Sequence, residues 1–181
     1  PGPSRRARLN FGRKTMKISA EELQRSIVAQ ILSLKQLAEA EGVKLTHVKP
    51  HGALYNEAAK DEKTAHIIID SLLEFDQKLA LFCPLNSVIS KLAKGKIPII
   101  FEACADRNYN PDYSLVSRSK SNALISEKEA VFEHLFSMFS EGKITCENGA
   151  KISCSATTFC LHSDTPNSVG IMSFLQQKFA E

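Results

Sequence analysis

The sequence has no long apolar run. No uninterrupted apolar stretch approaches the roughly 18 to 20 residues that a membrane-spanning helix needs, and no apolar segment of signal-peptide type follows the basic N-terminus. These absences predict a soluble, cytoplasmic protein with no membrane partner. With 181 residues, 43% of them hydrophobic, the chain fits one globular domain, because a chain of this length buries roughly 70% of its unfolded surface.

Cysteine motifs and nucleotide-binding motifs are also missing. The five cysteines are odd in number and show no C-x-x-C spacing, so we predict small buried thiols rather than a disulfide framework or a zinc knuckle. Neither G-x-G-x-x-G nor G-x-x-x-x-G-K-[ST] occurs, so the chain contains no conventional nucleotide cradle.

Acidic residues are absent from the first 20 positions, which hold six basic ones, so the remainder carries 17 basic against 20 acidic residues. The body of the protein therefore does not indicate a nucleic-acid partner. Residues 1–8, PGPSRRAR, combine arginine with proline, glycine and serine and lack apolar periodicity. We predict a disordered end there, in preference to a basic arm for an acidic partner.

Helical and extended patterns alternate along the rest of the chain. The segment 19–41 predicts an amphipathic helix, with Ser19 as N-cap, Glu22 three residues later and Gly42 as the stop. A second helical pattern runs from Gly52 to Phe75 with a break near Asp61, and a last one follows residues 164–166 and ends near Phe179. Strands are predicted at 44–48, 79–83, 97–103 and 156–162.

Alternating strands and helices predict an α/β fold with a parallel sheet. Parallel folds bind ligands at the carboxyl ends of their strands, and polar residues follow three of the predicted strands. We therefore expect one acid/base pocket there. Its candidates are Lys49 and His51 after the first strand, Glu102, Asp106 and Arg107 after the third, and His162 and Asp164 after the last.

Each histidine also has a purely structural interpretation. His47 alternates within a strand, and His66 and His134 sit in helical patterns, so we interpret the latter two as surface groups. For His51 and His162, which terminate apolar strands, a functional role and a loop-capping role are both open. The long polar loop 105–118 is typical of a functional lid, and its alternative is an unstructured excursion.

Four stretches of the sequence resemble the LamB/YcsF family, namely LNFGRKTM (9–16), VKPHGALYN (48–56), EACADRNYNPDYSLVSRSKSNALI (102–125) and CLHSDTP (160–166). The best described members are the A subunits of the prokaryotic ATP-dependent 5-oxoprolinase. The resemblance implies a cytoplasmic (β/α) barrel of the sugar-deacetylase type, seven-stranded and TIM-like, over residues 9–181. It also implies a complex with subunits B and C that uses ATP as co-substrate and opens 5-oxoproline to glutamate.

The sequence departs from the family at its start and at three glycines. The motifs DLN-DLGE, CGFHAGD and HPS or HPG, which precede NFGR in the family, are absent. We therefore expect a partial barrel, incomplete at its N-terminus, that self-associates as a homo-oligomer or borrows a segment from another chain. We also expect the chain as given to show no 5-oxoprolinase activity, with or without partner subunits. Tyr113, Asn122 and Ser163 stand where the family usually has glycine, and Asn122 and Ser163 could alter the backbone angles.

The resemblance gives the candidate residues chemical roles. Lys49 and either Arg107 or Arg118 suit stabilisation of an oxyanion or phosphate. His162 paired with Asp164, or His51 held by Glu102, suits delivery of a proton to the ring nitrogen. Lys49, His51, Glu102, His162 and Asp164 are thus the predicted catalytic residues, and Tyr55, Asp106, Arg107 and Arg118 are the predicted substrate-binding residues.

Two other functions stay open. The chain could be a catalytically inactive interaction module, or a stand-alone carbohydrate deacetylase that depends on a divalent metal ion. Sugar-deacetylase relatives bind such a metal through Asp and His, and this chain alone would not complete the ligand set.

Overall fold

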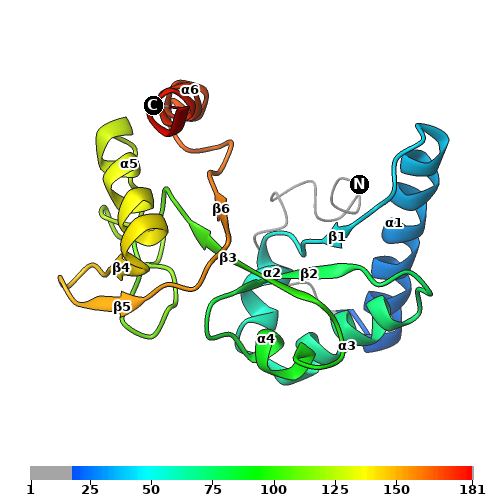
Figure 1. Ribbon diagram of the computed structural model, residues 1–181. Coiled ribbons are helices and arrows are strands. Elements are labelled where there is room, and N and C mark those ends of the chain that lie inside the picture. The colour runs from blue at the N-terminus through cyan, green and yellow to red at the C-terminus, as the bar shows by residue number, and fades with distance from the viewer. Residues whose placement is uncertain (1–17, 181) are drawn as a thin grey trace. The chain divides into compact units, whose positions relative to one another are not determined.

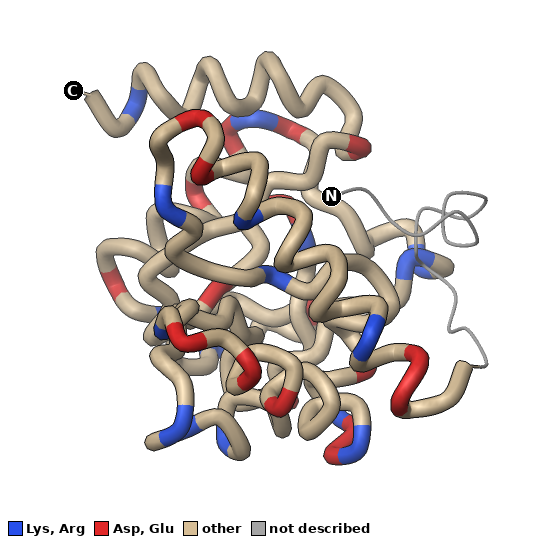
Figure 2. Tube along the Cα trace, turned by 90° about the vertical axis from the view of Figure 1, so that its right-hand side faces the viewer, with Lys and Arg blue, Asp and Glu red and all other residues tan. Residues whose placement is uncertain are grey.

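The computed structural model describes residues 18–180, which divide between two compact units, residues 1–100 and 101–181 (Figure 1). The predicted disordered end, residues 1–8, and the motif at residues 9–16 lie outside the described residues. Among the helices that the structure describes, none is both long and apolar enough to cross a membrane. Basic and acidic residues are interspersed along the described chain (Figure 2).

The first unit opens with helix α1, Ala20–Ala40. Ser19 is its N-cap, and the Ser19 hydroxyl accepts a hydrogen bond from the backbone N–H of Glu22 at 3.1 Å. This bond satisfies one of the amide groups that the first turn of a helix leaves without an internal partner. Gly42 follows with a φ of 71°, a conformation that glycine adopts without steric strain. The predicted start and stop of this helix are therefore confirmed.

Strands and helices alternate through the rest of the first unit. Strands β1 and β2 pair in parallel, with His47 opposite Ala80. Asp61 caps α3 by accepting a hydrogen bond from the backbone N–H of Thr64 at 2.7 Å, so the predicted helix break at Asp61 is confirmed. The elements are β1 (His47–Val48), α2 (Ala53–Ala58), α3 (Glu62–Leu73), β2 (Ala80–Pro84) and α4 (Val88–Ala93).

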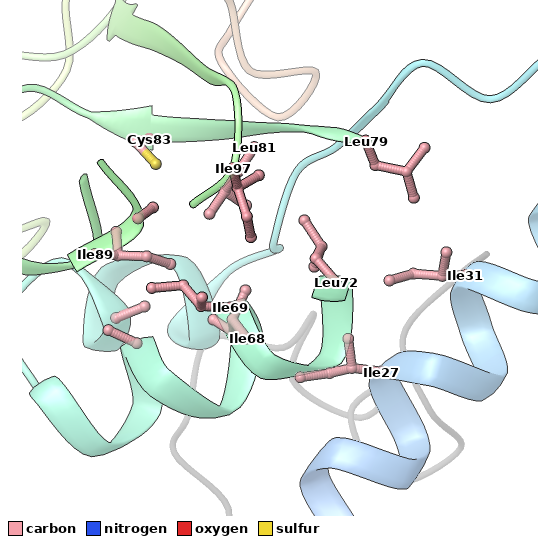
Figure 3. Packing of buried hydrophobic residues seen from close by; sticks show 13 residues of the cluster. Ile27, Ile31, Ile68, Ile69, Leu72, Leu79, Leu81, Cys83, Ile89 and Ile97 are labelled. Atoms are coloured by element: carbon pink, nitrogen blue, oxygen red, sulfur yellow. The ribbon is translucent and has the colours of Figure 1, made fainter. Parts of the chain in front are cut away.

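An aliphatic core holds these elements together (Figure 3). It gathers Ile31 from α1, Ile69 and Leu72 from α3, Leu81 from β2 and Ile89 from α4. Each of these residues is buried. Fully burying such a side chain stabilises the fold by roughly 1.5–3 kcal/mol, so the spacing of apolar residues along α1 and α3 positions the helices against the strands.

Strand β3, Ile99–Cys104, passes from the first unit into the second, where it pairs in parallel with β6, Thr158–Cys160. Between them lie α5 (Lys128–Phe136), a π-helical turn η2 (Ser137–Glu141) and a hairpin of β4 (Lys143–Thr145) and β5 (Lys151–Ser153). Helix α6, Ser168–Ala180, ends the described chain.

The fold is therefore of the α/β class with parallel strand pairs, as predicted. The antiparallel β4–β5 hairpin was not predicted. A closed seven-stranded barrel, a single domain over residues 9–181 and a rim shared by both units stay predictions.

Candidate functional site

Strands β3 and β6 bring Asp106 and His162 to the same edge of the second unit. Each residue follows its strand by two positions, and Cys104 lies opposite Cys160 in the register of the pair. The backbone N–H of Ala105 donates to the carbonyl of Cys160 at 2.8 Å, so the pairing continues one step past β3. Two residues that are 56 positions apart in sequence thus lie side by side.

The Asp106 carboxylate is fully buried and holds His162 in place. One of its oxygens lies 2.8 Å from Nδ1 of His162, and the other accepts from the backbone N–H of His162 at 2.8 Å and from the Thr165 hydroxyl at 2.5 Å. Asp106 is 0% exposed and Thr165 3%, whereas the His162 side chain is 31% exposed. With Nδ1 committed to Asp106, Nε2 of His162 is the ring nitrogen that can exchange a proton with a bound molecule.

This pairing shifts both pKa values in the direction of an ion pair. The hydrogen bond with the Asp106 carboxylate raises the pKa of His162 above its ordinary value, although burial opposes the shift. Burial alone would raise the pKa of Asp106, but hydrogen bonds from His162 and Thr165 outweigh it and lower that pKa. His162 therefore retains a proton closer to neutral pH than a free imidazole does, which suits a general acid.

Asp164 was one predicted partner of His162, and the structure shows Asp106 at the Nδ1 atom of that histidine. Nδ1 of His162 bonds to Asp106 instead, because the parallel register of β3 and β6 places Asp106 beside it. Asp164 lies in the turn before α6, where its carboxylate is 3.4 Å from a terminal guanidinium nitrogen of Arg118.

The two candidate arginines occupy different environments. Arg107 is 6% exposed, and its guanidinium donates to the carbonyl oxygens of Ala123 at 3.1 Å and Val116 at 2.7 Å. Burial lowers the pKa of Arg107, and the charge of Arg118 lowers it further. The Arg118 side chain is 33% exposed, and its charge acts to lower the pKa of His162. Arg107 thus binds backbone carbonyl oxygens of the loop, while Arg118 is the more exposed of the two arginines.

The loop after β3 is a folded element with its own hydrogen bonds. The backbone N–H of Val116 donates to the carbonyl of Asn108 at 2.9 Å, and that of Ile125 donates to the carbonyl of Asp106 at 3.0 Å. The Tyr109 hydroxyl accepts from the backbone N–H of Cys104 at 2.7 Å. These bonds fix the polar stretch that was interpreted as a lid, so Arg118 projects from an ordered segment.

The remaining predicted residues lie elsewhere. Lys49, His51 and Tyr55 belong to the first unit, just after β1, where the Lys49 ammonium is 5.8 Å from the centroid of the Tyr55 ring. Glu102 lies within β3 and is 6% exposed. The convergence of the first-unit residues with His162 stays a prediction.

Two residues of the site region were missed or misplaced by the sequence analysis. Thr165, within the Asp-Thr-Pro turn before α6, was not proposed, although a threonine there can donate to a nearby carboxylate. His134 was interpreted as a surface group, and this is wrong: its Nε2 is buried and has no hydrogen-bond partner among the described residues. Burial lowers the pKa of His134. A helical pattern alone does not show which face a neighbouring loop covers.

The donors at this site do not form a metal centre. Within residues 18–180, no group of three or more His, Cys, Asp or Glu side chains is placed to hold a metal ion. Both oxygens of Asp106 are engaged by His162 and Thr165.

Comparison with known proteins identifies relatives over nearly the whole chain. The model of the LamB/YcsF family matches residues 2–181. The A subunit of the 5-oxoprolinase from Pyrococcus abyssi is 40% identical over 174 residues, which are 96% of this chain and 68% of the relative. The protein of the same name from Haemophilus influenzae strain PittEE is 40% identical over 92% of this chain and 69% of its own.

A solved structure has the same fold. The crystal structure of the lactam utilization protein from Thermus thermophilus superposes with a TM-score of 0.88 and is 32% identical. The match covers 95% of this chain and 69% of that protein.

Proposed function

The chain belongs to the LamB/YcsF family, and we propose on that premise that it is the A subunit of an ATP-dependent 5-oxoprolinase. The enzyme would hydrolyse the cyclic amide of 5-oxo-L-proline to L-glutamate in the cytoplasm, together with subunits B and C. Relatives named as A subunits of 5-oxoprolinase and a structural neighbour named lactam utilization protein support this function. The observation in this chain that carries it is the Asp106–His162 pair.

Lactam opening needs a proton donor at the ring nitrogen. An amide is a poor electrophile, so we propose that a phosphoryl group from ATP activates the carbonyl oxygen before water attacks the carbonyl carbon. When the C–N bond breaks, the ring nitrogen must gain a proton. Protonated His162 can donate it from Nε2, and the buried charge of Asp106 stabilises the imidazolium until that transfer.

Arg118 supplies the positive charge beside His162. The 5-oxoproline substrate carries a carboxylate, and a guanidinium can bind a carboxylate with two parallel hydrogen bonds. Asp164, 3.4 Å from Arg118, positions the guanidinium before substrate arrives. Lys49, in the first unit, remains the proposed partner of the phosphate or of the developing oxyanion.

The test is His162→Ala in the full-length protein with subunits B and C. We expect ATP-dependent formation of glutamate from 5-oxoproline to fall by roughly 100-fold to 10,000-fold, while the three subunits still co-purify. His66→Ala is the matched control, because His66 is exposed on α3 and should leave turnover unchanged.

Three outcomes would contradict the proposal. Full turnover in His162→Ala would remove His162 from the chemistry. Loss of assembly together with activity would favour an interaction module. Release of acetate from an acetylated sugar without ATP, in a wild-type protein that leaves 5-oxoproline intact, would favour a deacetylase.

A further inference from the structure

Two cysteines lie opposite each other at the strand ends, two positions before Asp106 and His162. Cys104 ends β3, Cys160 ends β6, and the two are partners in the parallel register. Neighbouring strands lie about 4.8 Å apart, within the separation of about 4.4–6.8 Å that disulfide-bonded Cα atoms span. Neither cysteine is part of a disulfide in the structure.

We propose that Cys104 and Cys160 are a reversible disulfide site, oxidised by a small disulfide such as glutathione disulfide, and that its oxidation disturbs the Asp106–His162 pair. Asp106 and His162 each follow one of these cysteines by two positions, just past the ends of the paired strands. The cross-link would therefore form one step from the hydrogen bonds that hold His162.

Exposure sets the order of the two exchange steps. Cys160 is half-buried and Cys104 is buried at 7% exposure, so the Cys160 thiolate attacks the small disulfide first and releases one glutathione thiolate. Cys104 then loses its proton, attacks the Cys160 sulfur and expels the second glutathione thiolate. Two protein thiols are oxidised and one small disulfide is reduced to two thiols. The hydrogen bond with Cys160, together with burial, raises the pKa of Cys104, so the second step is slow near neutral pH.

A disulfide would change the distance between the two sulfur atoms at the strand ends that precede Asp106 and His162. Its sulfurs are about 2.05 Å apart with a torsion near 90°, whereas no bond joins the two sulfurs in the reduced protein. Closing that bond reorients both cysteine side chains at the strand ends, two positions before Asp106 and His162, and would shift these two residues relative to each other. A displacement on the order of 1 Å can lower turnover by about 100-fold.

The experiment oxidises the purified protein with glutathione disulfide, blocks the remaining thiols with N-ethylmaleimide and maps tryptic peptides by mass spectrometry. Cys104 falls in the peptide 97–107, whereas Cys154 and Cys160 share the peptide 152–178. The Cys154→Ser variant therefore assigns the cross-link without ambiguity. We expect a linked pair of peptides that dithiothreitol separates, unchanged in Cys154→Ser and lost in Cys160→Ser.

Mapping needs no enzymatic activity, so it is independent of the proposed function. Glutathione left on Cys160 alone, or a cross-link through Cys154, would overturn the site. The second readout is the NMR titration of His162, whose pKa should shift in the oxidised protein and return on reduction. A fully cross-linked protein with an unchanged His162 titration would overturn the coupling to the site.

Discussion

At the scale of single residues, the buried carboxylate of Asp106 determines what His162 can do. Three donors converge on Asp106, and two of them belong to His162 itself. One carboxylate therefore fixes both the backbone and the ring of the histidine, and the same charge favours the protonated imidazole. We infer that Asp106 acts as a positioning residue; its predicted contact with substrate stays a prediction.

Asp106→Asn should separate these effects. The amide keeps the shape of the carboxylate but removes its charge, so we expect the pKa of His162 to fall from its raised value and kcat to drop by about 100-fold. NMR titration of His162 and the pH profile of kcat measure the two changes. Thr165→Val, which removes only one donor to Asp106, is the control and should have the smaller effect on both. An unchanged His162 titration in Asp106→Asn would contradict this role.

The same pair should make stability depend on pH. Because the folded-state pKa of His162 is raised, its stabilising contribution is complete below the unfolded value of about 6.5 and disappears as pH rises through the folded pKa. Because the pKa of Asp106 is lowered, its contribution is present above about 3.8 to 3.9 and disappears as pH falls through the folded pKa. Urea unfolding across pH should show both losses, and Asp106→Asn should remove both. Wild-type and variant curves of the same shape would argue against the pair.

Arg118 can be tested through the charge of the substrate. Arg118→Ala in the full-length protein with its partner subunits should lower kcat/KM for 5-oxoproline by roughly 10-fold to 100-fold, since a charged hydrogen bond contributes about 1.5–3 kcal/mol. The uncharged lactam 2-pyrrolidinone lacks the carboxylate, so its turnover, compared in the same variants, should change little. Equal losses for both substrates would indicate that Arg118 does not recognise the carboxylate. Lys120→Ala is the control, because Lys120 pairs with Glu147 on the surface, 3.0 Å away.

At the scale of secondary-structure elements, local signals set where the helices begin. Ser19 and Asp61 each accept a hydrogen bond from the backbone N–H three residues later, and each was recognisable in the sequence. The loop after β3 depends on distant partners instead, because the guanidinium of Arg107 binds carbonyl oxygens 9 and 16 positions away.

Ser19→Ala should therefore destabilise α1. Loss of an N-cap costs about 1 kcal/mol, which thermal or urea unfolding can resolve. Ser33→Ala is a matched control within the same helix, because the Ser33 hydroxyl donates only to the carbonyl of Ala29 and alanine is the better helix former. Equal destabilisation by the two substitutions would show that the cap at Ser19 has no special role.

At the scale of the whole molecule, the chain divides into two compact units, and the three hydrogen bonds that Asp106 makes with His162 and Thr165 lie in the second. A substitution that loosens Asp106 should therefore lower amide protection first in residues 101–181. In hydrogen exchange of Asp106→Asn, we expect β3, β6 and the loop after β3 to exchange faster, while α1 and α3 keep their protection. Uniform loss of protection would mean that the two units open together.

The sequence by itself determined several of the helices and strands and the family. Caps, apolar spacing and β-branched runs act within a few residues, so α1, the break at Asp61 and the parallel strands could be predicted from the order of the amino acids. The family motifs could likewise be recognised, because each is a continuous stretch of sequence.

Only the tertiary structure decided which of these residues meet. In the register of β3 against β6, the ring of His162 bonds to Asp106, and Cys104 lies opposite Cys160. Asp164 lies 3.4 Å from Arg118. Folding of the loop buries Arg107 and exposes Arg118. These pairs join residues 46 to 56 positions apart, and no local propensity encodes such a separation. A hydrogen bond between side chains depends on distances of a few ångströms, which are fixed only when the strands have paired.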